Sequence, residues 1–312
     1  MWIKRIVLFA FVNILIVLTI SLLMQVLGVT PYMTAYGLDY KSLMIFCLLW
    51  GFGGAFISLG ISRIMAKMAM GVKVIDPNSA TGTERQLVDM VHRLAQAAHL
   101  PAMPEVGIYE SPEVNAFATG PTKSRSLVAV SRGLLSRMKS AEVEGVLGHE
   151  VAHIANGDMV TMTLVQGVVN AFVMFFARVI AFALSQAMRG DRDDRGGSFG
   201  ASYMLTFVLE IALGFFGMIL VAAFSRMREF RADQGGADLA GRGKMIAALQ
   251  ALNGMTQLVD QGAQQSVATM KISAGKPRGF MRLFMTHPPL EERIQRLQES
   301  YGTQQVGAFS GR

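Results

Sequence analysis

Four long runs of apolar residues dominate the chain, and each contains few charged positions. They are Ile6–Leu27, Ser42–Ile61, Val160–Met188 and Tyr203–Phe224. A hydrocarbon core about 30 Å thick needs about 20 helical residues, so each run is long enough to cross a membrane. We therefore predict four transmembrane helices. The first run is longer than the apolar part of a secretory signal and lacks a small-residue cleavage site, which predicts a retained anchor.

The rest of the chain has the shorter patterns of a globular fold. Apolar residues at helical spacing predict helices over residues 83–98, 141–156, 225–239, 244–259 and from Pro288 or Pro289 onward. Strand-like stretches lie at 105–109, 114–119 and 127–130, and the turn between the last two predicts an antiparallel hairpin. A loop rich in Gln and Gly is expected around 261–279. The sequence therefore predicts a small α+β unit beside the membrane helices.

Composition agrees with a membrane protein, since 52% of residues are hydrophobic and only 16% are charged. The single cysteine, Cys47, excludes an intramolecular disulfide, and its apolar surroundings favour a packing role. The net charge of +7 suits either a nucleic acid or an anionic membrane surface. Because no basic stripe interleaved with aromatic residues is present, we expect the lipid bilayer and no nucleic acid as a partner.

Basic residues predict the orientation of the membrane helices. Lys4 and Arg5 precede the first run, whereas Arg63 and Lys67 follow the second. The positive-inside rule then places both termini and the globular segments in the cytoplasm. Two charged residues, Arg178 and Glu210, lie inside apolar runs. We expect either a pair between them or an Arg178 side chain that reaches the outer interface.

The stretch Gly148-His149-Glu150-Val151-Ala152-His153 contains H-E-x-x-H inside a predicted helix that ends before Gly157. Residues four apart share one helix face, so His149 and His153 can bind one Zn²⁺ while Glu150 lies beside the open position as a general base. The alternative is a chance match in an amphipathic helix. Only five histidines occur in the chain, which weakens that alternative.

A catalytic zinc needs a third protein ligand, and no third histidine follows at the extended spacing. Glu229 is the best downstream carboxylate, because the hairpin formed by the last two apolar runs returns the chain to the same membrane face. Asp233, one helical turn later, could orient a ligating imidazole. A solvated Glu229 among the neighbouring arginines is the alternative.

Four motifs carry a resemblance to the HtpX family, bacterial membrane-bound zinc endopeptidases related to the CAAX prenyl proteases. The motifs are Glu113–Gly120 (EVNAFATG), His149–Asp158 (HEVAHIANGD), Arg228–Asp233 (REFRAD) and Thr286–Ile294 (THPPLEERI). They stand in the family's order, and the resemblance spans nearly the whole chain. It implies an α-helical membrane protein with an α+β zincin-like (gluzincin) metalloprotease domain.

Carried over to these positions, the resemblance implies one Zn²⁺ held by His149, His153 and Glu229, with Glu150 as general base. It also implies substrate contact by Asn115 and roles for His287 and Arg293 near the scissile carbonyl. From the residues alone, Asn115 is only a polar residue in a strand, and His287 could cap a helix.

We therefore expect a zinc endopeptidase that cleaves membrane proteins or other polypeptides at the cytoplasmic face of the bacterial inner membrane. The resemblance implies protein quality control in a stress response, with functional overlap with an ATP-dependent membrane protease. Two alternatives are a processing peptidase of the prenyl-protease type and a non-catalytic membrane scaffold with a structural zinc. The sequence leaves cleavage specificity and oligomeric state undetermined.

The expected organisation has four segments. They are an N-terminal transmembrane pair (1–62), a cytoplasmic segment with H-E-x-x-H (63–159), a transmembrane hairpin (160–224) and a cytoplasmic segment with the third zinc ligand (225–312).

Overall fold

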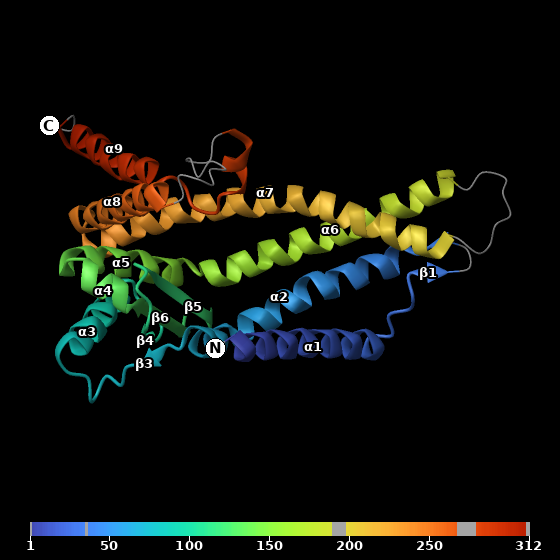
Figure 1. The fold of residues 1–312 in the computed structure, drawn as a ribbon, viewed down its shortest axis with the longest axis horizontal. Coiled ribbons are helices and arrows are strands. Elements are labelled where there is room, and N and C mark those ends of the chain that lie inside the picture. Colours follow the sequence, from blue (N-terminus) through green and yellow to red (C-terminus); the bar gives the residue numbers. More distant parts are fainter. Residues whose placement is uncertain (1, 35–36, 189–197, 267–278, 310–312) are drawn as a thin grey trace. The chain divides into compact units, whose positions relative to one another are not determined.

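The computed structural model divides the chain into two compact units, each built from two stretches that are far apart in sequence (Figure 1). The first contains Met1–Gly60 and Thr161–Ala222, and the second contains Ile61–Val160 and Ala223–Arg312. The structure describes residues 2–34, 37–188, 198–266 and 279–309. We call the first the membrane unit and the second the protease unit, after the roles that the sequence predicts for them.

Long helices make up the membrane unit. They are α1 (Trp2–Val26) and the larger parts of α2 (Tyr40–Met70), α6 (Asp158–Met188) and α7 (Ser198–Ala240), with the two-residue strands β1 (Met33–Thr34) and β2 (Gly37–Leu38) between α1 and α2. The remaining residues of α2, α6 and α7 belong to the protease unit. A Cβ atom on Gly51 would lie 2.7 Å from the Gly167 carbonyl oxygen, so glycine is what allows α2 and α6 to approach each other here.

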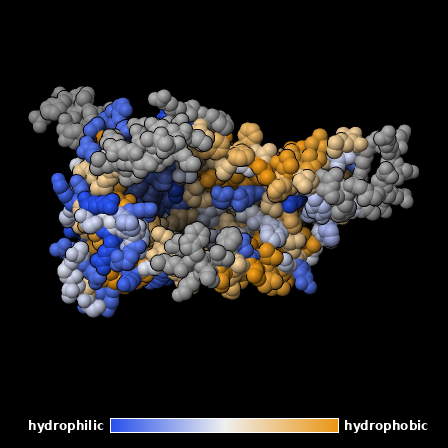
Figure 2. All heavy atoms as spheres, in the orientation of Figure 1, coloured by the Kyte–Doolittle hydropathy of each residue, from blue (hydrophilic) through white to orange (hydrophobic). Residues whose placement is uncertain are grey.

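Among the described residues, three helices are long and apolar enough to cross a membrane: α2, α6 and residues 202–240 of α7. Within the described part of α1, the apolar stretch is Ala10–Val26, which is shorter than these three helices. The fourth transmembrane helix therefore stays a prediction. Large apolar side chains are exposed along these helices, among them Phe11, Phe172 and Phe216. Figure 2 shows apolar side chains over the membrane unit and hydrophilic ones over the protease unit. Such exposed apolar surface is expected where lipid is the solvent.

A four-stranded sheet lies at the centre of the protease unit. Its strands are β3 (Lys73–Val74), β4 (Glu105–Tyr109), β5 (Ala116–Thr122) and β6 (Arg125–Ser131), in the order β3-β4-β6-β5. The predicted hairpin is confirmed by the antiparallel pairing of β5 with β6, whereas β4 pairs with β6 in parallel. The central strand β6 is buried almost throughout, as its apolar sequence requires, and β5 lies at one edge.

Helices pack on this sheet and on one another. They are α3 (Gly82–Ala97), α4 (Arg132–Arg137), α5 (Ser140–Asn156), α8 (Arg242–Ser266), the 3-10 helix η1 (Gly279–Phe284) and α9 (Leu290–Phe309). Apolar residues of α3 and α5, such as Val91 and Leu147, meet β6 residues such as Val128 in the main core. Gly157 ends α5 with a φ of 70°, the left-handed conformation that suits glycine at a helix C-terminus.

Two of our boundary predictions are wrong. The separate helix expected from Ser225 does not form, because α7 continues without a break to Ala240 and no glycine, proline or cap interrupts it near Phe224. Helix α8 continues to Ser266, into the stretch expected to be a loop, while the rest of that expected loop, 267–278, lies outside the described residues. The short edge strand β3 was not foreseen.

Candidate metal centre

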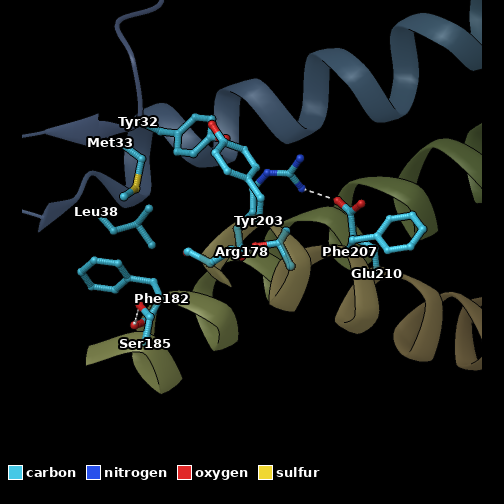
Figure 3. A pocket seen from close by; sticks show the side chains of 11 residues that line it. Tyr32, Met33, Leu38, Arg178, Phe182, Ser185, Tyr203, Phe207 and Glu210 are labelled. Atoms are coloured by element: carbon cyan, nitrogen blue, oxygen red, sulfur yellow. Dashed lines mark hydrogen bonds and ion pairs between the residues drawn. The ribbon is translucent and has the colours of Figure 1, made fainter. Parts of the chain in front are cut away.

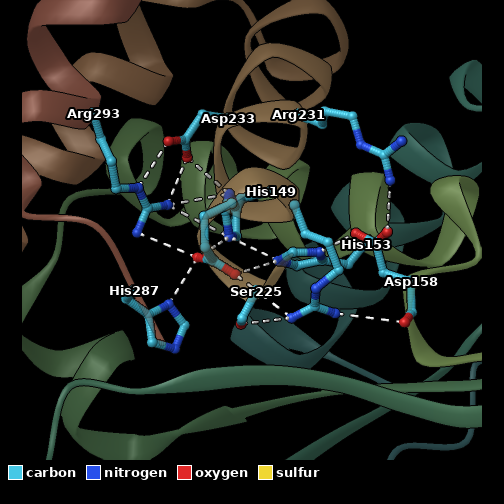
Figure 4. Close-up of polar contacts among 10 residues, drawn as sticks. His149, His153, Asp158, Ser225, Arg231, Asp233, His287 and Arg293 are labelled. Atoms are coloured by element: carbon cyan, nitrogen blue, oxygen red, sulfur yellow. Dashed lines mark hydrogen bonds and ion pairs between the residues drawn. The ribbon is translucent and has the colours of Figure 1, made fainter. Parts of the chain in front are cut away.

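His149 and His153 lie on adjacent turns of α5 and point to the same side (Figure 4). Their rings are in edge contact, and the two Nε2 atoms are 3.1 Å apart. His149 is buried, with 8% of its surface exposed. The spacing of four residues has therefore placed both imidazoles at one point, as the sequence predicted.

The carboxylate of Glu229, on α7, completes the cluster. Its Oε2 is 3.5 Å from Nε2 of His149, and its Oε1 is 3.4 Å from Nε2 of His153. One donor atom from each of the three residues lies within 4.8 Å of the others. Glu229 is only 1% exposed, so it is not the solvated surface charge that the sequence left open.

Small residues bring α7 close enough to α5 for this contact. A Cβ atom added to Gly236 would lie 2.9 Å from the backbone nitrogen of His149, and one added to Gly235 would lie 2.8 Å from the Ala152 Cβ. From the other side, a Cβ on Gly148 would lie 2.9 Å from that of Ala240. Gly235 and Gly236 thus allow Glu229, the third candidate ligand, to reach the two histidines.

Carboxylates fix the orientation of both imidazoles. Nδ1 of His149 is 3.0 Å from Oδ1 of Asp233, and Nδ1 of His153 is 2.6 Å from Oδ2 of Asp158. A neutral imidazole that donates its Nδ1 hydrogen to a carboxylate has an unprotonated Nε2. In that neutral form, which is the one that binds a metal, both Nε2 lone pairs are directed toward the Glu229 carboxylate.

This donor set fits a divalent metal. Two imidazole nitrogens and a carboxylate converge, and Oε1 of Glu229 is buried with no hydrogen-bond partner among the described residues. Buried polar atoms normally have partners, so a carboxylate oxygen without one, beside two imidazole nitrogens, fits the binding of a cation. A set of two histidines and one glutamate is one that catalytic metal sites use.

The two glutamates of the centre have pKa values shifted in opposite directions. Burial alone would raise the pKa of Glu229, but its contacts with His149, His153 and His287 outweigh burial and hold that pKa far below the ordinary value. Burial raises the pKa of Glu150, although the neighbouring His149 and His153 oppose the shift. Glu229 is thus kept ionised, while the raised pKa of Glu150 suits a group that accepts and releases a proton.

Arg293 and His287 approach the cluster from the C-terminal part of the chain. Arg293 is 7% exposed; its Nε donates to Oδ2 of Asp233 at 2.7 Å, and its Nη1 is 3.5 Å from Oε2 of Glu229. Nδ1 of His287 is 2.8 Å from the same Glu229 oxygen, and the His287 side chain is 66% exposed. Both residues therefore lie at the centre, although their chemical roles stay predictions.

A cavity of about 140 Å³ opens beside the cluster. Asn115, His149, Glu150, Glu229, His287 and Arg293 all line it, together with apolar residues of α4, α5 and α8. Asn115 lies immediately before β5 rather than inside the strand, and its backbone N–H donates to the Ser131 hydroxyl. The structure thus brings all eight candidate residues to one site, with Asp233 just behind the histidine.

Our sequence analysis missed Asp158. This residue is fully buried, and besides His153 its Oδ1 contacts Arg231 at 3.3 Å. Asp158 ends the HEVAHIANGD motif, five residues after His153. That spacing was a usable signal, because Gly157 turns the chain at the end of α5 and brings Asp158 back toward the ring.

Comparison with known proteins agrees with this geometry. The sequence model of peptidase family M48 matches residues 82–301. A protease HtpX homolog of Thiobacillus denitrificans is 53% identical, over 94% of this chain and 98% of its own length. The homolog of Bacillus subtilis is 52% identical over 95% and 99%, and protease HtpX of Xanthomonas campestris pv. campestris is 49% identical over 96% and 99%.

Among solved structures, the crystal structure of S. mikatae Ste24p is similar in fold, with a TM-score of 0.63 at 17% sequence identity. The similarity covers 95% of this chain but 65% of that longer one. The expected fold class is thereby supported. A family match over most of the chain, half-identical relatives over nearly full length, a cluster of metal-ligating residues and long apolar helices lead to one conclusion: this chain is a membrane metalloprotease that belongs to peptidase family M48.

Proposed function

We propose that this protein is a zinc endopeptidase that hydrolyses peptide bonds of membrane proteins at the cytoplasmic face of the bacterial inner membrane. The observation that carries the proposal is the convergence of His149, His153 and Glu229 beside Glu150 in a cavity. One metal ion per chain fits this cluster.

Zinc is the proposed metal because two imidazoles and one carboxylate are the ligand set of zinc peptidases. A zinc ion bound there would polarise the substrate carbonyl and lower the pKa of a bound water to about 7. Asp233 and Asp158 would hold the two imidazoles in the ligating orientation through their Nδ1 atoms.

Glu150 is the proposed general base. Its carboxylate would accept a proton from the attacking water and pass it to the leaving amine, and its raised pKa suits both steps. Because Nδ1 of His287 donates to Glu229, the exposed Nε2 would donate to the developing oxyanion only in the doubly protonated form of the ring. Arg293 adds positive charge beside the same carboxylate and fixes Asp233.

An extended substrate would bind along β5. This strand lies at the sheet edge, and the carbonyl of Asn115, the residue before it, accepts a hydrogen bond from the backbone N–H of Ser131 on β6. In an antiparallel pair the next residue, Ala116, directs its backbone groups away from β6, where a peptide could add as a further strand. Ala118 donates a backbone hydrogen bond to Glu150, which ties the same edge to the general base. Asn115 would then contact the substrate near the scissile bond.

The cellular setting rests on charge distribution and on the relatives. Lysine and arginine residues flank the apolar runs on the side proposed as cytoplasmic. The relatives are named protease HtpX. We therefore infer a role in quality control of membrane proteins, overlapping with that of an ATP-dependent membrane protease. The proposed organisation remains a transmembrane pair (1–62), a transmembrane hairpin (160–224) and two protease segments (63–159 and 225–312).

The alternatives are less well supported. A structural zinc in a scaffold would have four protein ligands, whereas the cluster found among the described residues offers three. A processing peptidase specific for one modified substrate is compatible with the similarity to Ste24p, but that similarity concerns the fold and does not favour it.

The test uses the purified full-length protein and Glu150→Gln. We expect the variant to keep the wild-type zinc content and to lose cleavage of an unfolded membrane-protein substrate by about a hundredfold or more. The matched control, Glu110→Gln, changes an exposed glutamate that pairs with Arg132 and should cleave normally. Normal cleavage by Glu150→Gln would refute the mechanism.

A further inference from the structure

A cavity of about 260 Å³ in the membrane unit lies outside the proposed mechanism (Figure 3). In its wall, Nη1 of Arg178 donates to Oε1 of Glu210 at 2.6 Å, which confirms the pair that we expected between them. Hydrogen-bond donors and acceptors line the cavity together, since the guanidinium of Arg178 and the hydroxyl of Tyr32 face it along with the Glu210 carboxylate. The lining therefore selects no single class of ligand.

Arg226, in the protease unit, makes contacts that point to a definite role. It lies on α7, two residues after the apolar run that ends at Phe224. Its Nη1 donates to the backbone carbonyl of Leu283 at 3.0 Å and to that of Met285 at 2.7 Å. These carbonyls lie at the C-terminal end of η1, where a helix has acceptors without partners of its own and a basic side chain can donate to them. Arg226 thus binds the backbone just before His287.

Several side chains of the segment that runs from η1 to His287 are exposed. The exposed fraction is 65% for Met281, 39% for Leu283 and 66% for the side chain of His287. Exposed side chains contribute little to packing, and segments with few buried apolar contacts open locally at low cost. The two hydrogen bonds from Arg226 are therefore important for the position of this segment.

On the other side of His287, the chain is fixed by the start of α9. The backbone N–H of Arg293 donates to the Pro289 carbonyl at 3.2 Å, and the Arg293 side chain donates to Asp233. His287 is therefore held between two points, with Arg226 before it and the first turn of α9 after it.

One face of α7 provides all these contacts. Arg226, Glu229 and Asp233 are spaced by three and four residues, which places them on the same side of the helix. Arg226 binds the η1 end, Glu229 lies 2.8 Å from Nδ1 of His287, and Asp233 accepts from Arg293 (Figure 4). The partners follow in the same order along the C-terminal segment. Glu229 and Asp233 already have roles at the metal centre, whereas Arg226 has none.

A positive charge at this place also suits the cytoplasmic end of a transmembrane helix. The two roles differ in what a substitution changes. Loss of a flanking charge affects the insertion and orientation of α7, whereas loss of the hydrogen bonds to Leu283 and Met285 affects the position of His287.

We propose that Arg226 is a positioning residue of the metal centre. By holding the backbone at Leu283 and Met285, it keeps the ring of His287 beside Glu229, and it acts on the reaction through His287 alone. The catalytic part of this inference rests on the proposed function, in which His287 donates to the developing oxyanion. The structural part rests on the hydrogen bonds themselves.

The first test is a double-mutant cycle in the full-length, zinc-loaded protein. His287→Ala should lower kcat by about 100-fold with KM nearly unchanged, because an oxyanion donor acts in the transition state. Arg226→Met, which removes the donor, should lower kcat by about tenfold at unchanged zinc content by displacing His287. The double variant should have the kcat of His287→Ala, since residues that act through one group are not additive. A further tenfold drop in the double variant would overturn the proposal.

The second test measures hydrogen exchange of the full-length protein by mass spectrometry and needs no catalysis. In Arg226→Met, the peptide covering residues 282–290 should exchange about tenfold faster, the effect of one hydrogen bond to a charged group. The matched control, Arg85→Met, removes an arginine Nη1 that donates to the Pro77 carbonyl at 2.9 Å, before and at the start of α3. It should keep the wild-type exchange of that peptide and the wild-type kcat. Wild-type exchange in Arg226→Met would overturn the proposal.

The two tests separate this proposal from the proposed function. A wild-type protein that cleaves no peptide bond would refute the proposed function, and the exchange rates would still decide whether Arg226 holds the segment. Full kcat in His287→Ala would overturn the positioning role, while the dependence of cleavage on Glu150 and zinc would stand.

Discussion

Buried charge is handled differently in the two units of this protein. In the membrane unit, Arg178 and Glu210 form a short ion pair, so each charge has a partner inside the fold. In the protease unit, two histidines face a carboxylate across an open centre, and Oε1 of the buried Glu229 has no hydrogen-bond partner among the described residues.

This difference distinguishes a charge pair that is balanced within the fold from a cluster that can bind a metal. The charge of the Glu210 carboxylate, whose side chain is 32% exposed, is balanced by Arg178 within the fold. Arg293 lies beside Oε2 of the buried Glu229, but only a metal ion can bind this carboxylate and the two imidazole nitrogens together. The Arg178–Glu210 pair needs no ligand, whereas the cluster of His149, His153 and Glu229 is complete only with a metal ion.

The largest expected effect comes from removing the carboxylate of Glu229. Glu229→Ala should lose most of its bound metal, and cleavage should fall to background, because two imidazoles alone leave the centre without its third ligand. Elemental analysis and a cleavage assay measure both. Glu210→Gln is the counterpart in the membrane unit and should keep wild-type metal content. Equal metal loss in both variants would remove the distinction between the two regions.

A smaller effect is expected from Asp158, which holds the ring of His153. Asp158→Asn keeps the shape but replaces the charged acceptor on Nδ1, so metal affinity should drop by about 10- to 100-fold. Competition with a fluorescent zinc chelator gives the affinity. Asp89→Asn, which changes an exposed carboxylate on α3, should bind metal normally. Unchanged affinity in Asp158→Asn would mean that His153 is oriented by other contacts.

Packing between α5 and α7 gives the next prediction. Gly236→Ala should lower the free energy of unfolding by about 1–3 kcal/mol and weaken metal binding, because the new Cβ collides with the backbone at His149. Chemical denaturation with and without zinc measures both quantities. Gly243→Ala, where nothing lies within 4 Å of the added atom, should be neutral or stabilising. Full stability of Gly236→Ala would contradict the close approach of the helices.

The smallest effect concerns pH. Glu150 must be ionised to accept a proton, and burial raises its pKa above the ordinary 4.5. Activity should therefore rise with pH as this carboxyl ionises, and the acidic limb of kcat/KM should have its midpoint above 4.5 when zinc is saturating. Replacement by the shorter acid, Glu150→Asp, should keep such a limb at lower activity. A midpoint at or below 4.5 would argue against a buried general base.

Much of this architecture follows from local sequence patterns. Apolar runs predicted the long helices, the spacing of His149 and His153 predicted a shared face, and Gly157 predicted the end of α5. Glu229 required an argument about chain direction, since it lies 76 residues beyond His153 in the printed sequence. Asn115, His287 and Arg293 were found only through family resemblance, because single polar residues carry no periodic signal.

Other features depend on tertiary contacts that a single sequence does not encode locally. The parallel pairing of β4 with β6 joins strands separated by β5, and the two-residue strand β3 is too short to have a pattern. The glycines at 235 and 236 look like helix breakers in isolation, yet they lie inside α7 because α5 packs directly against them. Asp158 was overlooked for the same reason, since its role depends on the turn made at Gly157.

The most direct test of the metal centre is the metal content of the purified wild-type protein together with the effect of removing that metal. The account predicts one zinc per chain, loss of cleavage after treatment with a chelator, and recovery when zinc is restored. Normal cleavage by the metal-free protein would contradict it.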